Sequence, residues 1–228
     1  LQVTLHMAAD FQLIQPCRQL VDLNPMLMTM EDERGFVPFF LAGIQGKIEL
    51  LPVIHDAAIR HFGEDGAKYT TRWVRNERYG GISLLHHAAL NDFATMAAWL
   101  IKHGAEVDLL SMSASSVFPI LTPLMMACKN NAANTAGVLI SAGADVNIVV
   151  ANASDNGDLT PLHVALEFKH IDLATYLYFK GGRSICNTQR CRKCRLYNRL
   201  LEKKVDGMRE SIRKSVENEE RAMQLARE

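Results

Sequence analysis

The sequence predicts an all-α fold, an α-solenoid of helix–turn–helix repeats followed by one long C-terminal helix. The main observation is a fixed spacing of 21 residues between a Ser or Thr that opens an apolar stretch and a glycine. It occurs three times, from Ser83 to Gly104, from Thr122 to Gly143 and from Thr160 to Gly181. Apolar residues between these anchors recur at helical spacing. Aromatic residues make up only 7% of the chain and strand-like alternation is scarce, which argues against all-β and α/β folds.

The residues that open the three units share the pattern of a helix start. They read Ser83-Leu84-Leu85-His86, Thr122-Pro123-Leu124-Met125 and Thr160-Pro161-Leu162-His163. A Ser or Thr at the N-cap accepts a hydrogen bond from a backbone N–H that otherwise lacks a partner. Proline suits the next position because its φ is already helical and its missing N–H costs nothing there. We therefore expect the first helix of each unit to begin directly after these anchors.

The glycines that close the units mark the ends of the second helices. A helix commonly ends where the chain adopts a positive φ, which glycine does without a steric penalty. The second helices carry apolar residues at helical spacing, and we expect these to form the core between neighbouring units. The predicted core residues are Met96, Ala97, Leu100 and Ile101, then Ala136, Val138, Leu139 and Ile140, then Leu173, Ala174, Leu177 and Tyr178.

Two further copies precede these three. The pattern that opens a unit, which we call the opening word, occurs without its proline at Thr4–Ala9. A degenerate copy follows 33 residues later at Val37–Ala42. Together, these words resemble the ankyrin repeat, whose unit is a turn plus two antiparallel helices with this period. The repeat pattern ends at Gly181-Gly182, and the balance of charge changes from acidic to basic soon after, so we expect a repeat domain over 1–183 followed by a helical extension over 184–228. The resemblance predicts five repeats at about 1–31, 32–78, 79–116, 117–154 and 155–183, with an insertion at about 56–79 that we expect to form a loop.

His6, His86 and His163 occupy one shared position of the opening word. The resemblance implies a structural role for this histidine, in which it ties the start of one repeat to its neighbour by hydrogen bonds. The sequence contains no Gly-rich phosphate loop, no G-x-S-x-G and no H-E-x-x-H motif. We therefore expect neither enzyme activity nor a cofactor in these residues.

The C-terminal extension is basic. Residues 190–228 carry 12 Lys or Arg and 7 Asp or Glu, whereas residues 1–189 carry 13 and 18. The extension lacks proline after Arg192 and is rich in strong helix formers. One face carries the apolar residues Leu201, Val205, Met208, Ile212 and Val216. We expect this helix to pack on the last repeat or on another helix, with capping favoured over a coiled coil, which requires more heptads.

Five cysteines divide into two groups. Cys17 and Cys128 lie in predicted repeat helices and are expected to be buried. Cys186, Cys191 and Cys194 form a C-x4-C-x2-C pattern whose thiolates could bind zinc, with His170 or a partner's residue as the fourth ligand. The basic residues 190–195 around them fit a phosphate contact, a nuclear import signal or a plain solvated helix start. A metal- or nucleic-acid-binding function of 186–195 is therefore the alternative to the function below.

Ankyrin-like repeats imply a protein–protein interaction module, such as a scaffold or adaptor, that binds through a concave surface of first helices and fingers. The resemblance places partner-binding residues seven and eight positions after each anchor and in the fingers. The insertion adds aromatic residues of the kind that dominate interfaces, although Trp73 could equally fold back onto a repeat. The expected set is Leu90, Asn91, Lys129, Asn130, Glu167, Phe168, Tyr79, Ile82, Phe118, Pro119, Asn156, Asp158, Tyr69 and Trp73.

The kind of partner and the compartment follow from the remaining features. A mixed, mostly polar surface favours a protein or peptide ligand over nucleic acid. The sequence has neither an apolar run of about 18 residues nor a signal segment, so we expect no membrane insertion and an intracellular location, cytoplasmic or nuclear. Because the chain starts at Leu1, almost inside an opening word, we expect it to be a piece of a longer protein.

Overall fold

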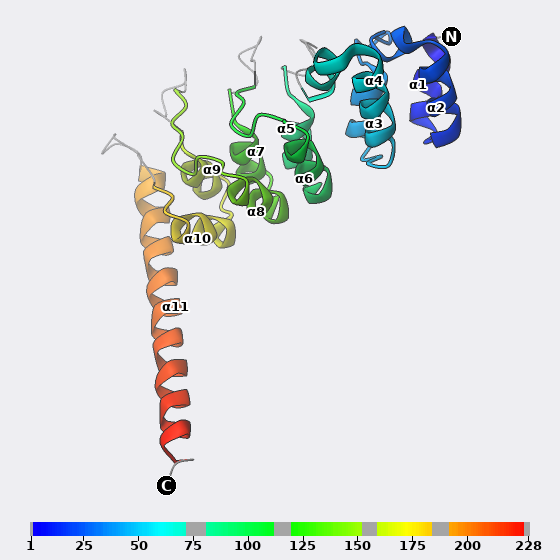
Figure 1. The fold of residues 1–228 in the computed structure, drawn as a ribbon. Coiled ribbons are helices and arrows are strands. Elements are labelled where there is room, and N and C mark those ends of the chain that lie inside the picture. Colours follow the sequence, from blue (N-terminus) through cyan, green and yellow to red (C-terminus); the bar gives the residue numbers. More distant parts are fainter. Residues whose placement is uncertain (1, 72–80, 112–119, 152–158, 184–191, 226–228) are drawn as a thin grey trace.

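The computed structural model describes residues 2–71, 81–111, 120–151, 159–183 and 192–225, and within these ranges the predicted all-α solenoid is confirmed (Figure 1). Five helix pairs follow one another along the chain. They are α1 (Gln2–Asp10) with α2 (Ile14–Leu23), α3 (Pro38–Ile44) with α4 (Leu50–Thr71), α5 (Leu84–Leu90) with α6 (Ala94–Lys102), α7 (Pro123–Lys129) with α8 (Ala133–Ser141), and α9 (Pro161–Glu167) with α10 (Ile171–Phe179). A short 3-10 helix, η1 (Pro25–Met28), follows α2, and α11 (Arg192–Leu225) follows the last pair.

The core runs without a break through the stack. Each first helix contacts the first helix of the next repeat, from α1 to α9, and each pair contacts internally. Gly43 shows how closely these helices approach, because a Cβ at this position would lie 2.5 Å from Cδ2 of Leu84 in the next repeat. A side chain at residue 43 would therefore require Leu84 to move. Of the predicted core residues, Tyr178 is exposed, and Tyr176 packs against the core instead.

The helix starts of repeats 3 to 5 have the predicted caps. The hydroxyl of Thr122 accepts the N–H of Met125 at 3.2 Å, and Thr160 accepts the N–H of His163 at the same distance. Ser83 accepts the N–H of His86 at a longer 3.4 Å. Gly104, Gly143 and Gly181 end their repeats at φ values of 90°, 93° and 87°, as expected for glycine at this position.

The predicted register of repeat 1 is wrong by one residue. Thr4 lies inside α1, which begins at Gln2, so it is not the N-cap. Gln12 has a φ of 56° and follows α1 as Asp92, with a φ of 55°, follows α5. Asp92 comes nine residues after Ser83, so the equivalent anchor of repeat 1 is Val3. The buried Leu5 and His6 set this register, because they match the buried Leu85 and His86.

The insertion expected at about 56–79 is helical as far as the structure describes it. Helix α4 runs through Thr71, interrupted at Gly63, where φ is 60° and ψ is −138°. Ala57 and Ala58 are fully buried. The first part of the predicted insertion therefore belongs to the second helix of repeat 2 and contributes to the core rather than forming a surface loop.

Helix α11 packs on the last repeat with its N-terminal half. It contacts α9 and α10, and its Leu201 and Val205 are buried in the core. An ion pair between Lys204 and Asp172 of α10 reinforces this contact. The predicted capping of repeat 5 is confirmed for this half. The remainder of α11 continues away from the stack (Figure 1).

Candidate partner-binding surface

The turn between the two helices of each repeat presents a pair of side chains at the end of the first helix. The pair is followed by a residue in the left-handed region, such as Asp92, Asn131 or Lys169. These pairs occupy the positions seven and eight residues after the anchors. We call them the first-helix row. It comprises Asp10 and Phe11, Ile44 and Gln45, Leu90 and Asn91, Lys129 and Asn130, and Glu167 and Phe168.

Hydrogen bonds within and between repeats fix the row. The amides of Asn91 and Asn130 each donate to a backbone carbonyl four residues earlier, at 3.0 Å. His87 Nε2 lies 3.0 Å from the carbonyl oxygen of Ile44, and His170 Nε2 lies 3.1 Å from that of Lys129. Because these histidines bridge to the preceding repeat, the spacing between neighbouring pairs is held by the backbone.

Phe168 is the largest apolar group in the C-terminal part of the row. Its side chain is 44% exposed, although the Lys129 ammonium lies 5.7 Å from the ring centroid and the His170 ring stacks on it at 6.5 Å. Leu90 and Phe11 are exposed at 40% and 65%. The row therefore carries exposed apolar side chains at three of its five steps, within otherwise polar and charged surroundings.

The N-terminal end of the row borders an acidic hollow of about 610 Å³. The Asp10 carboxylate accepts a hydrogen bond from the side-chain amide of Gln45, and the Asp10 backbone carbonyl accepts one from the Lys47 ammonium. Arg34 pairs with Asp32 at 2.8 Å. The hollow is lined by His6, Met7, Asp10, Glu31, Asp32, Glu33, Arg34 and Leu41.

The surroundings of Asp32 in this hollow favour its ionised form. Partial burial opposes ionisation of Asp32, but the N–H groups of Phe36 and Arg34 and the Arg34 guanidinium outweigh it and lower its pKa. Glu31 and Glu33 are exposed. A basic side chain of a partner would therefore meet several negative charges at this end of the row.

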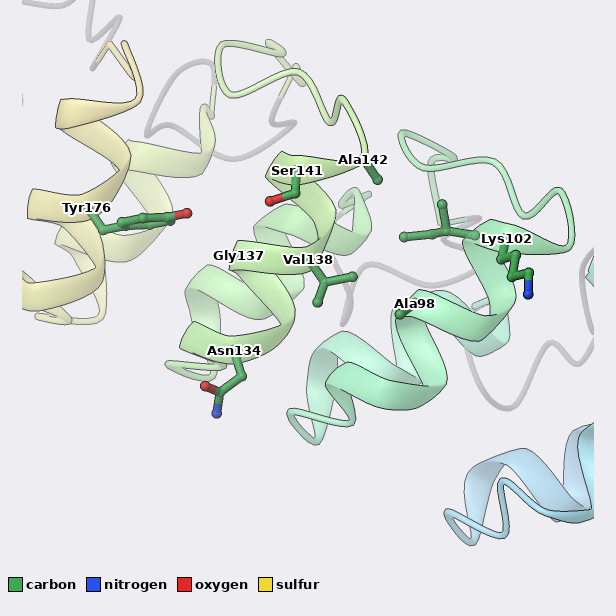
Figure 2. A pocket seen from close by; sticks show the side chains of 9 residues that line it. Ala98, Lys102, Asn134, Gly137, Val138, Ser141, Ala142 and Tyr176 are labelled. Atoms are coloured by element: carbon green, nitrogen blue, oxygen red, sulfur yellow. The ribbon is translucent and has the colours of Figure 1, made fainter.

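A second depression, of about 580 Å³, lies among the second helices α6, α8 and α10 (Figure 2). Tyr176 projects from α10 toward α8, and its hydroxyl would lie 3.9 Å from a Cβ at Gly137. The amide of Asn134 donates to Asp92 at 2.8 Å and so serves the packing of repeats 3 and 4. The described residues that line this depression include no carboxylate, histidine or cysteine, and its titratable side chains are Lys102 and Tyr176.

The recurring histidines of the opening words are structural in the two repeats where their bonds are described. His86 Nδ1 lies 2.8 Å from the Ser83 hydroxyl, and its Nε2 lies 3.1 Å from the carbonyl oxygen of Leu121 in the next repeat. Burial lowers the pKa of His86 to about 4. His6 Nε2 lies 2.8 Å from the carbonyl oxygen of Phe36. His163 is also buried, which lowers its pKa.

The other predicted site residues are only partly described. Ile82 is half-buried and packs against the core. Tyr69 lies in α4 and Cys194 in α11, but their side chains are outside the described part of the structure. The residues that lie wholly outside it are Trp73, Tyr79, Phe118, Pro119, Asn156, Asp158, Cys186 and Cys191.

The zinc and nucleic-acid alternative therefore stays a prediction. Within the described ranges no three His, Cys, Asp or Glu side chains gather closely enough to hold a metal ion. The zinc content of the purified chain and salt-dependent binding to RNA or DNA would test the segment 186–195 directly. No helix in the described part of the chain is long and apolar enough to cross a membrane.

Four residues of the row escaped the sequence-based prediction: Asp10, Phe11, Ile44 and Gln45. The signal was present, because the same offset of seven and eight residues reaches them from Val3 and Val37. The sequence analysis used the offset only for repeats 3 to 5, so these positions of repeats 1 and 2 were left out.

Comparison with known proteins agrees with this repeat structure. The family model described as ankyrin repeats (3 copies) matches residues 54–149 and 85–189. The chain belongs to the ankyrin repeat family. It is also similar to "Putative palmitoyltransferase ZDHHC13" of Danio rerio, with 31% identity over 108 residues. This match covers 47% of the present chain and 15% of that protein.

Proposed function

We propose that this ankyrin chain is a protein-interaction module, a scaffold or adaptor, whose first-helix row and adjoining fingers form a concave surface that binds a partner protein or peptide. The observation that carries the proposal is the set of exposed apolar side chains Phe11, Leu90 and Phe168 at equivalent steps of the row. Isolated exposed apolar residues are ordinary on protein surfaces. Recurrence at two neighbouring positions of the repeat along a rigid stack fits a line of anchoring contacts.

The construction of the row also supports binding. Side chains held by neighbouring groups lose little freedom when a partner docks, which lowers the entropic cost of association. Phe168 is held in this way between Lys129 and His170. Aromatic side chains of this kind dominate the energetics of protein interfaces. A partner segment with apolar side chains spaced to meet the row would use this preorganisation.

The acidic hollow suggests the polarity of the partner. Carboxylates of Glu31, Asp32 and Glu33 line it beside repeats 1 and 2, whereas Lys129 provides a positive charge near repeat 5. Complementary charges mainly set orientation and association rate. The proposed ligand therefore carries its basic residues at the end that meets repeats 1 and 2.

The proposal also covers the cellular compartment and the role of the repeats within a longer protein. Cys17 and Cys128 are buried free thiols, which fits a reducing intracellular compartment. The proposal assigns no catalysis to this chain. It treats the repeats as the recognition part of a longer protein, and the activity named for the Danio rerio relative remains that protein's own.

A matched pair of variants tests the function. Phe168→Ala removes an exposed ring from the row, and Phe179→Ala removes a similarly exposed ring from α10 of the same repeat. In affinity capture with quantitative mass spectrometry, we expect Phe168→Ala to weaken retention of specific partners by roughly tenfold or more. Phe179→Ala should retain them.

Photo-crosslinking gives an independent readout of the same surface. A photoreactive side chain in place of Asn130 should crosslink to the captured protein, whereas one in place of Ser141 on α8 should not. Equal loss of binding in both phenylalanine variants, or crosslinks only from the second helices, would overturn the assignment of the row.

A further inference from the structure

We propose that the C-terminal half of α11, residues 206–225, pairs with the same segment of a second copy of this chain as two antiparallel helices. This inference is independent of the first-helix row. It rests on the apolar face that α11 leaves uncovered and on the distribution of charge along that half of the helix.

The uncovered face continues the stripe with which α11 docks on the last repeat. Leu201 and Val205 are 3% and 2% exposed where they meet α9 and α10. Beyond them the stripe becomes exposed, with Met208 at 41%, Ile212 at 60%, Val216 at 48% and Met223 at 61%. At about 100° per residue all six side chains fall within roughly 80° of one helix face. The apolar face with which α11 packs on the repeats therefore continues, exposed to solvent, along the rest of the helix.

The uncovered part is long enough to form a paired unit. Its 20 residues span about 30 Å, and this half of α11 lies beyond the repeat stack (Figure 1). A helix of this length receives most of its stability in water from packing of its apolar face. Pairing would bury the four exposed apolar side chains while leaving both repeat stacks outside the overlap.

The charges of this half are arranged with opposite signs at its two ends. Residues 206–214 carry Arg209, Arg213 and Lys214 against Asp206 and Glu210, a net charge of +1, and residues 216–225 carry Glu217, Glu219 and Glu220 against Arg221, a net charge of −2. Part of this charge is paired within the helix, Arg209 with Asp206 and Arg213 with Glu210 and Glu217. In an antiparallel pair centred near Ser215, the basic segment of each copy faces the acidic segment of the other. A parallel pair in register would place like charges together, which is unfavourable. Charge complementarity therefore selects a second copy in the antiparallel orientation.

Glu219 also favours the antiparallel over the parallel orientation. Its position falls on the apolar stripe, between Val216 and Met223. In the antiparallel pair it faces the segment around Arg213 of the other copy, whereas in a parallel pair it would face itself. A carboxylate in the seam and a stripe shorter than three or four heptads limit the affinity. We expect a weak, reversible dimer.

Sedimentation velocity of the full chain tests the dimer over a range from about 5 to 500 μM. We expect the wild-type mass to rise from monomer to dimer across this range. Ile212→Asp should remain monomeric because it places a charge on the stripe. Asn218→Asp adds the same charge off the stripe and should dimerise. At about 5 μM, where all three chains are monomeric, they should melt at the same temperature, because residues 212 and 218 lie outside the contact with the last repeat.

Charge exchange tests the orientation. One variant carries Arg209→Glu and Arg213→Glu, and another carries Glu219→Lys and Glu220→Lys. Neither should self-associate, and their mixture should dimerise. A chain with all four changes should dimerise with itself but not with the wild type. Wild-type chain that stays monomeric throughout, a dimer insensitive to Ile212→Asp, or a mixed dimer of wild type with the four-change chain would overturn the proposal.

Discussion

Repeats 3 to 5 and repeats 1 and 2 reach the same architecture by different means. In the later repeats, a hydroxyl such as that of Thr122 caps the first helix. In repeat 2 the N-cap is Val37, whose side chain makes no such bond. The rings of Phe36 and Phe40 instead stack at 5.3 Å in the core of this repeat. Local capping therefore defines where the first helices of repeats 3 to 5 begin. The first helix of repeat 2 begins without a side-chain cap, beside buried aromatic rings.

The bonds between repeats differ in the same way. Asp92 of repeat 3 accepts the N–H of Thr135 at 2.8 Å and so caps the start of α8 in repeat 4. Between repeats 1 and 2, the turn residue Gln12 instead donates to the exposed Glu49 at 2.8 Å, although the buried His6 bridges to Phe36 as His86 bridges to Leu121. The comparison teaches that the repeat period is kept by packing, and that the recognisable opening word is one of several ways to stabilise it.

Removal of a core ring should have the largest effect. Phe40→Ala deletes a buried aromatic side chain, and such changes cost about 3–5 kcal/mol of unfolding free energy. Leu162→Ala in repeat 5 should cost about 2–5 kcal/mol, nearer the lower end because the cavity is smaller. Urea denaturation followed by circular dichroism measures both. A larger loss for Leu162→Ala would contradict the dependence of repeat 2 on its aromatic core.

Acid should weaken the stack through His86. Burial lowers the folded-state pKa of this histidine to about 4, whereas the unfolded chain has the ordinary value of 6.5. The unfolded state therefore binds a proton first, so the stability present above pH 6.5 is lost as pH falls toward 4. The full effect is about 3 kcal/mol. Thermal melts between pH 7 and 4.5 should show the decline.

His86→Gln provides the control for this pH effect. It should be less stable at neutral pH, because the bonds to Ser83 and the Leu121 carbonyl are altered. Its melting temperature should fall less steeply with acid than that of the wild type. Parallel curves for the two chains would show that other groups carry the acid sensitivity.

The glycine that closes repeat 4 should tolerate no branched side chain. Gly143 has a φ of 93°, and although the space around its Cβ position is open, the backbone conformation is strained for other residues. Gly143→Val should cost about 1–3 kcal/mol. Gly207 in α11 also has open space but no positive φ, so Gly207→Ala should stabilise the helix by about 0.5–1 kcal/mol. Equal effects of the two changes on melting temperature would contradict the role of φ.

The contrast between the repeats also sets what the sequence could reveal. The anchors of repeats 3 to 5 were predictable because capping and closing glycines are local chemistry. The anchor of repeat 1 was misplaced because Thr4 looks like a cap, while the register depends on burial of Leu5 against a neighbour distant in sequence. The helical insertion through Thr71 was missed for the same reason. Offsets from the anchors placed Lys129 and Phe168, but their mutual contact required the structure.

The smallest predicted effects come from moving a cap between the two kinds of repeat. Thr122→Ala removes the side-chain acceptor for the N–H of Met125 and should cost about 1 kcal/mol. Val37→Thr introduces an acceptor where the backbone already has N-cap geometry, with φ of −81° and ψ of 154°. This change should raise stability by a few tenths to about 1 kcal/mol, since capping offsets the loss of a half-buried methyl group. Paired urea titrations measure both changes. If Val37→Thr is destabilising by more than 1 kcal/mol, burial of the valine outweighs capping, and repeat 2 depends on packing even at its helix start.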